Sequence, residues 1–196
     1  VKDPDKSGRE QQNYLIRVKY GKLTDNLTNG INISVPEATG AIAFYKKSHL
    51  IIKVKSRNGY LTFMMGKILI NEKGTAGRFD TLWTFYVKNT TGFSRGQDIY
   101  YDAQTDCLFI PQCNNANNVN KIMVVNLSGE SETYKGNKLY TPQDIITVDK
   151  QKDYSKYEIE SLVIAPKRHI VMVANIVPKG TKTADDAVER ISNLKF

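Results

Sequence analysis

The stretch of sequence that decides the fold is residues 157–175, which read YEIESLVIAPKRHIVMVAN. Two apolar segments flank a turn at residues 166–168, and two carboxylates, Glu158 and Glu160, lie where the first segment begins. Runs of β-branched residues on either side of a proline-containing turn are typical of a β-hairpin. We therefore predict two antiparallel strands in this stretch.

The same pattern occurs twice more upstream. Residues 41–54 and 98–110 each contain an apolar segment, a polar turn and a second apolar segment. The three copies follow one another at intervals of about 60 residues, within the range of one four-stranded propeller blade with its loops. The further strands that we expect are residues 59–64, 121–127 and 187–194 as third strands and residues 31–35, 81–87 and 145–148 as outer strands. Residues 13–20 resemble a third strand, which predicts a leading half-blade.

This repeat predicts the architecture. One such sheet cannot bury both of its faces, whereas sheets packed around an axis cover one another. We predict an all-β fold, built as a β-propeller of four-stranded antiparallel blades that form a complete or a partial ring. A β-sandwich is the alternative, because the copies could also be successive hairpins.

The length of the chain fits one domain. Its 196 residues suffice for one hydrophobic core, and we expect a single domain over residues 13–196 after a flexible, polar leading segment at residues 1–12. No apolar run approaches the roughly 20 residues that a transmembrane helix needs. The first residue is Val1 and not Met, so we expect a processed product, or a domain whose N-terminal part is missing.

The net charge of +8 would attract polyanions. The lysines are scattered along the chain and are not concentrated on one element, so we expect no dedicated nucleic-acid site. A glycan or an anionic cell-surface polymer is the partner that we expect.

Cysteine and histidine do not indicate a cofactor. If residues 107–113 form a strand, the two cysteines lie roughly 20 Å apart, so we expect free thiols. His49, Cys107 and His169 each open the second strand of their copy. Equivalent positions on different blades lie too far apart to share a zinc ion, and we expect neither a metal nor a cofactor.

The candidate ligand site lies where the innermost strands begin, beside the predicted axial channel. Two facing carboxylates there could act as acid and base, as in glycoside hydrolysis, although hydrogen bonding to loop backbone is the simpler interpretation. The neighbouring loops are rich in amides and hydroxyls, as sugar-binding surfaces are. The predicted ligand-binding residues are Gln97, Asp98, Asn114, Asn115, Glu158, Glu160 and Asn175. For Trp83, the only tryptophan, we expect a core position, with a stacking platform as the alternative.

Several segments resemble a known family. The segments GQDIYYD at residues 96–102, LFI at 108–110, KIMVV at 121–125, YEIESL at 157–162 and VERI at 188–191 resemble the C-terminal half of helveticin J-type bacteriocins. The resemblance covers residues 96–196. It implies a secreted antibacterial protein with a propeller-like repeat, and therefore an extracellular or cell-surface location in bacteria.

The expected function is a non-enzymatic module of an exported bacterial protein that binds a glycan or cell-wall polymer. One alternative is a propeller hydrolase or lyase that uses Asp98 together with Glu158 or Glu160. The other is a protein-interaction scaffold, because a propeller scaffold does not set function by itself.

Overall fold

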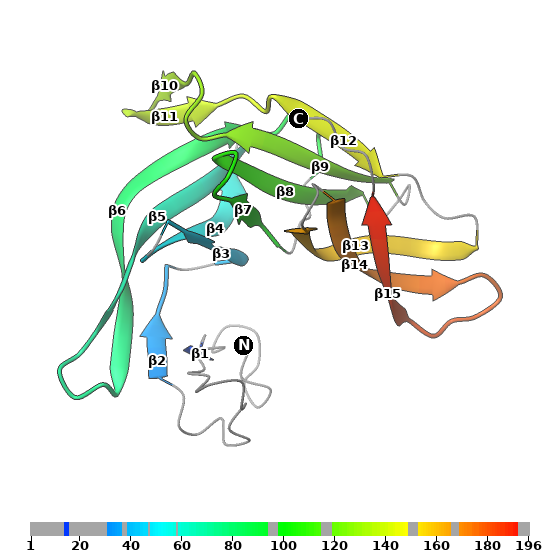
Figure 1. Ribbon diagram of the computed structural model, residues 1–196, viewed down its shortest axis with the longest axis horizontal. Coiled ribbons are helices and arrows are strands. Elements are labelled where there is room, and N and C mark those ends of the chain that lie inside the picture. Colours follow the sequence, from blue (N-terminus) through cyan, green and yellow to red (C-terminus); the bar gives the residue numbers. More distant parts are fainter. Residues whose placement is uncertain are drawn as a thin grey trace.

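The computed structural model describes residues 14–15, 31–36, 39–46, 48–57, 59–93, 98–114, 119–148, 153–165 and 169–191 (Figure 1). These residues form β-strands and turns without a helix, which confirms the all-β prediction. Accordingly, none of the described segments is a helix long and apolar enough to cross a membrane.

The described strands form three sheets, each built on an antiparallel meander. The first contains β3 (Ala41–Tyr45), β4 (His49–Arg57), β5 (Tyr60–Ile70) and β6 (Ala76–Lys88), and it is extended by β1 (Tyr14–Leu15) and β2 (Ile31–Ser34). The second contains β7 (Tyr100–Asp102), β8 (Cys107–Asn114), β9 (Val119–Asn126) and β12 (Asp144–Val148). The third contains β13 (Tyr154–Ala165), β14 (His169–Pro178) and β15 (Asp185–Ile191).

A small hairpin connects the second sheet to the first. Strands β10 (Glu132–Tyr134) and β11 (Asn137–Tyr140) lie between β9 and β12 in the chain. Strand β11 pairs in parallel with the last part of β6, so that Leu139 lies opposite Tyr86. The hairpin therefore bridges two sheets that are otherwise joined through their packed faces.

The core consists of three apolar clusters. Two of them lie on the two faces of the second sheet, and the third, which contains Leu50, Ile52 and Phe79, lies on the other face of the first sheet. Leu108 and Ile110 of β8 face the first sheet and pack in the same layer as Phe63. Phe109, between them in the sequence, faces the third sheet and packs in the same layer as Tyr157. This alternation follows from the two-residue period of a strand. Strand β7 lies against both β3 and β13, so the first strands of the three sheets lie side by side.

The three predicted hairpins and their third strands are confirmed, including the hairpin of residues 157–175. The outer strands of the first two copies are also found, as β6 and β12, and within the described residues the third sheet has no fourth strand. The sheets are open and do not close into a ring.

The predicted leading half-blade is wrong as a separate sheet. Strand β2 pairs in parallel with β6, and β1 pairs with β2, so both extend the first sheet. The strand predicted at residues 31–35 is present as β2, and its Ile33 is buried. Its partner is the outer edge of β6, where Ile33 lies opposite Gly77, and periodicity does not specify an edge. Residues 1–12 lie outside the described part of the chain.

Candidate ligand-binding site

The long hairpin of β5 and β6 contains a β-bulge that determines the local geometry of the candidate site. Met65 pairs with Trp83 and Gly66 pairs with Thr81, which leaves Leu82 as the extra residue. A Cβ atom on Gly66 would lie 2.1 Å from the carbonyl oxygen of Asp80, so this position requires glycine. Bulges bend a strand and redirect the neighbouring side chain, which here is Trp83.

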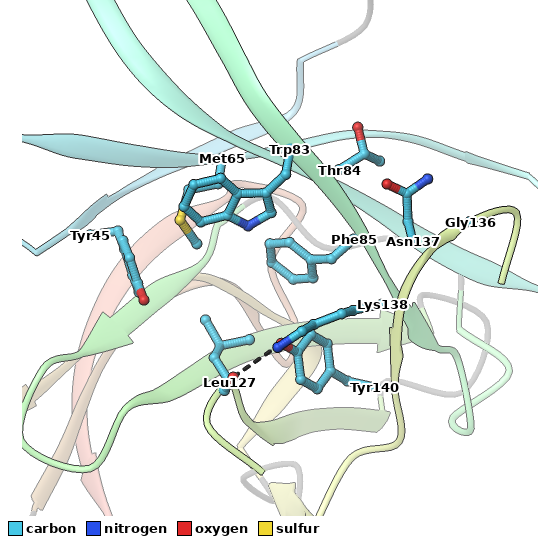
Figure 2. A pocket seen from close by; sticks show the side chains of 10 residues that line it. All are labelled: Tyr45, Met65, Trp83, Thr84, Phe85, Leu127, Gly136, Asn137, Lys138 and Tyr140. Carbon is cyan, nitrogen blue, oxygen red and sulfur yellow. Dashed lines mark hydrogen bonds between the residues drawn. The ribbon is translucent and has the colours of Figure 1, made fainter. Parts of the chain in front are cut away.

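Trp83 borders a pocket of about 400 Å³ between the first sheet and the β10–β11 hairpin (Figure 2). Its side chain is 45% exposed, so the expected core position for this residue is wrong and the stacking-platform alternative fits the structure. The pocket is lined by Tyr45, Met65, Trp83, Thr84, Phe85, Leu127, Gly136, Asn137, Lys138 and Tyr140.

Buried aromatic rings form one wall of this pocket. The ring of Phe85 stacks on Phe63 at 5.1 Å and meets the edge of Tyr140 at 5.7 Å. The hydroxyl of Tyr140 donates a hydrogen bond to the carbonyl oxygen of Leu127 over 3.0 Å, as Figure 2 shows. Because Phe85 and Tyr140 are buried and held by these contacts, this wall of the pocket is preorganised.

The polar groups of the pocket come mainly from the β10–β11 hairpin. The Nδ2 of Asn137 donates to the carbonyl oxygen of Lys135 over 3.0 Å, which leaves its Oδ1 as an acceptor. The ammonium of Lys138 lies 5.8 Å from the centre of the Tyr140 ring. Thr84 and Asn137 also border the pocket, but each precedes an inward-facing residue, Phe85 or Lys138, and their side chains point away from the aromatic rings (Figure 2). The pocket thus combines aromatic surfaces with one cation.

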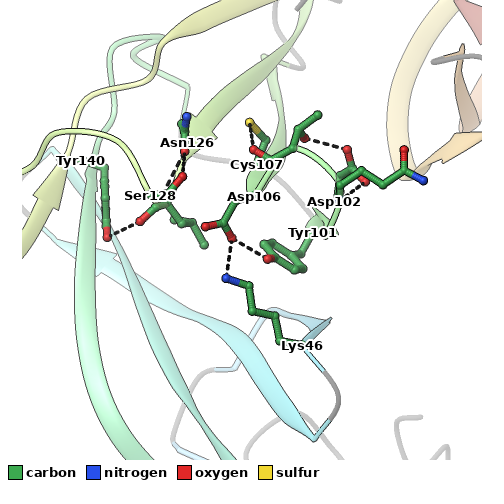
Figure 3. Close-up of polar contacts among 11 residues, drawn as sticks. Lys46, Tyr101, Asp102, Asp106, Cys107, Asn126, Ser128 and Tyr140 are labelled. Carbon is green, nitrogen blue, oxygen red and sulfur yellow. Dashed lines mark hydrogen bonds and ion pairs between the residues drawn. The ribbon is translucent and has the colours of Figure 1, made fainter.

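A polar cluster beside the pocket connects the first two sheets (Figure 3). The Nζ of Lys46 lies 3.2 Å from Oδ1 of Asp106, and the Tyr101 hydroxyl donates to the same oxygen over 2.5 Å. Burial, followed by the bond to this carboxylate, raises the pKa of Tyr101, which keeps the phenol protonated. The Tyr101 ring lies 4.6 Å from the ring of Tyr45. The cluster therefore fixes Tyr45, a side chain that lines the pocket.

Three of the predicted ligand-binding residues, Asp98, Glu158 and Asn175, lie near the end of β8 that is far from the aromatic pocket. Glu158 is only 3% exposed, and its Oε1 accepts a bond from the thiol of Cys113 over 3.2 Å. Its Oε2 lies 3.1 Å from Nζ of Lys156, which also donates to Oδ1 of Asn175 over 3.3 Å. Asp98 accepts a hydrogen bond from the backbone amide of Leu162 over 3.3 Å. These groups thus form a polar junction between the second and third sheets.

Lys53 of β4 is a buried cation near this junction, and no sequence pattern indicated its burial. Burial lowers the pKa of Lys53 to about 8, although Cys113 and Asp98 oppose the shift. The alternation of β4 places Lys53 on the same face as Ile51, toward the second sheet.

For two further predicted ligand-binding residues, Glu160 and Asn114, the structure shows the position in the strand. Glu160 is the extra residue of a β-bulge in β13, between the pairs formed by Ile159 and Ser161. Asn114 ends β8 opposite Val119. Gln97 and Asn115 lie outside the described residues.

The polar junction lies at the far end of β8 from the aromatic pocket. The strand begins at Cys107, next to the Lys46–Asp106 pair, and ends at Asn114, next to the thiol that contacts Glu158. At about 3.3 Å per residue, the two ends are roughly 20 Å apart. The structure therefore separates the predicted carboxylates from the aromatic pocket.

Both cysteines are thiols that form no disulfide bond, as predicted, and the structure shows that both are buried. His49, Cys107 and His169 do begin β4, β8 and β14. Within the described ranges there is no group of three or more His, Cys, Asp or Glu side chains that could hold a metal ion.

Part of the pocket could have been found from the sequence. The dipeptide Lys135–Gly136 is typical of a hairpin turn, and both of its residues have positive φ in the structure. The aromatic residues Tyr134 and Tyr140 lie on either side of this turn. The parallel pairing of β11 with β6 has no local signal in the sequence.

No protein-family model matches this chain, and no curated protein or solved structure is significantly similar to it.

Proposed function

We propose that this protein binds a glycan in the aromatic pocket, with one face of a sugar ring stacked on Trp83. The observation that carries the proposal is a half-exposed tryptophan at the border of a pocket with a rigid aromatic wall. Large aromatic side chains with no ligand usually bury more of their surface, and an aromatic face matches the C–H face of a sugar ring.

The dimensions and the polar groups of the pocket support a sugar. A volume of about 400 Å³ lies within the range of small-molecule sites. The backbone groups of Gly136 and the ammonium of Lys138, which line the pocket, can form hydrogen bonds with sugar hydroxyl groups. The apolar surface would supply affinity, and these few polar groups would supply orientation.

The wider architecture that we propose is a β-propeller, with the three sheets as consecutive blades. Three consecutive meanders with their first strands side by side support this proposal, as does the burial of both faces of the second sheet. The setting that we propose is an exported bacterial protein of the bacteriocin type, which acts outside the cell on a cell-wall glycan. The resemblance of residues 96–196 and the net charge of +8 support this setting.

The experiment is a comparison of wild-type protein with Trp83→Ala on a glycan array and on intact Gram-positive cells. Leu82→Ala is the matched control, since Leu82 is the adjacent, exposed bulge residue and does not line the pocket. We expect Trp83→Ala to weaken binding roughly five- to thirtyfold, because loss of stacking on a tryptophan costs on the order of 1–2 kcal/mol. Equal binding by both variants, or no binding by the wild type, would contradict the proposal.

A further inference from the structure

The charges around the aromatic pocket do not balance. Among the lining residues that the structure describes, there is one cation, Lys138, and no carboxylate. Sites for neutral sugars need acceptors as well as donors for the hydroxyl groups, and a lysine can only donate. The pocket therefore has a fixed positive charge without a compensating negative one.

Two carboxylates on the elements around the pocket are already engaged. Asp106 pairs with Lys46 and accepts a bond from Tyr101. Glu132, on β10, pairs with Lys88 at the end of β6. In the described part of the chain Lys138 has no ion-pair partner, and its ammonium lies over the ring of Tyr140.

The hairpin also fixes where this charge lies. Lys138 pairs with Phe85 across the parallel β6–β11 junction, and the Lys88–Glu132 ion pair connects the same two elements. In Figure 2 the Lys138 side chain extends across the aromatic wall toward the carbonyl of Leu127. The ammonium is thus placed within the pocket that Trp83 borders.

We propose that the ligand is an anionic saccharide, whose carboxylate or phosphate group pairs with Lys138 while its sugar ring stacks on Trp83. This inference rests on the proposed glycan-binding function and specifies its ligand class. The shared chemistry is a sugar ring that carries, or is linked to, a negatively charged group. A carboxylate would come from a uronic acid, and a phosphate from a poly(glycerol phosphate) chain that bears glucosyl groups.

The test uses three polymers immobilised for biolayer interferometry: polygalacturonate, its fully methyl-esterified form and glucosylated poly(glycerol phosphate). The esterified form keeps the sugar and removes its charge. Binding of the wild type is compared with that of Lys138→Met and of Lys135→Met. Lys135 is the matched control, because it lies on the same hairpin, over Tyr134, and outside the pocket.

We expect the wild type to bind an anionic polymer more tightly than the esterified one, and Lys138→Met to lose roughly fivefold in affinity for the anionic polymer only. Lys135→Met should change binding less than twofold. Preference for polygalacturonate would assign a carboxylate, and preference for glucosylated poly(glycerol phosphate) a phosphate.

Two results would overturn the inference, and they differ in what they say about the proposed function. If the esterified polymer binds through Trp83 as tightly as the charged ones, the pocket binds glycans but does not select anions. If the two lysine variants lose affinity equally, the attraction comes from the net charge and not from the pocket. A third result, in which the wild type binds none of these polymers and nothing on the glycan array, would contradict both proposals.

Discussion

Replacing the buried lysine at the polar junction should stabilise the protein and remove a pH dependence. Lys53 is 7% exposed and faces the second sheet. Its pKa falls from the ordinary value of 10.5 to about 8, chiefly because burial disfavours the charged form. Methionine has a similar length and no charge, so Lys53→Met keeps most of the packing and removes the buried ammonium.

The size of the effect follows from proton linkage. Because the folded-state pKa of Lys53 lies below the unfolded-state value, the unfolded chain binds more protons between about pH 8 and pH 10.5, and the free energy of unfolding rises with pH across that window. Between pH 7 and pH 10 this contribution amounts to roughly 2–3 kcal/mol. The raised pKa of Tyr101 makes the free energy of unfolding fall as the pH rises, but only above about pH 10. The comparison is therefore limited to pH 7–10.

The assay is urea unfolding at pH 7, 8, 9 and 10. The wild type should gain roughly 2–3 kcal/mol over this range relative to Lys53→Met. The variant should be the more stable protein at pH 7, with a difference that shrinks toward pH 10. Lys67→Met, at an exposed position on the neighbouring strand, is the control and should follow the wild type. Parallel pH profiles for wild type and Lys53→Met, or a variant that is less stable at pH 7, would refute this reasoning.

Two further changes test the elements around the pocket. Gly66→Ala should destabilise the protein by about 2–3 kcal/mol in urea unfolding, because the new methyl group would overlap the Asp80 carbonyl; a loss below about 0.5 kcal/mol would show that the bulge can relax. Asp106→Asn should cost less than about 1 kcal/mol, since Lys46 is half-exposed and asparagine tolerates the φ of 55° at this position. Asp106→Ala should cost about 2–3 kcal/mol, because it also removes the acceptor for the Tyr101 hydroxyl, and equal losses in both variants would contradict that difference.

The repeating part of the fold could be predicted because its signals are local. Each hairpin has its own alternation and turn, so β7, β8, β9 and β12 were all expected at or near their observed positions. The assignment of β1 and β2 failed for a different reason. Strand β2 pairs with β6, at the outer edge of the first meander, and β1 pairs in turn with β2. An edge accepts a new strand through backbone groups that every sequence contains.

The candidate site was predicted less well for a related reason. Conspicuous carboxylates suggested the junction at Glu158, where the structure shows a buried group bound by Cys113 and Lys156. The aromatic pocket depends on a bulge at Leu82 and on a parallel strand pair, neither of which leaves a periodic signal. Trp83 lies two residues before the buried Phe85 on β6, on the same face, so alternation predicts a buried position for it, whereas it is 45% exposed.

The most direct test of glycan binding uses the fluorescence of Trp83, because this chain has no other tryptophan. Its emission should change saturably on titration with a glycan that the array identifies, and iodide should quench the bound protein less than the free one. The half-saturation of both signals should match the dissociation constant from an independent binding assay. A glycan that binds tightly while Trp83 emission and its quenching by iodide stay unchanged would contradict the assignment of this pocket.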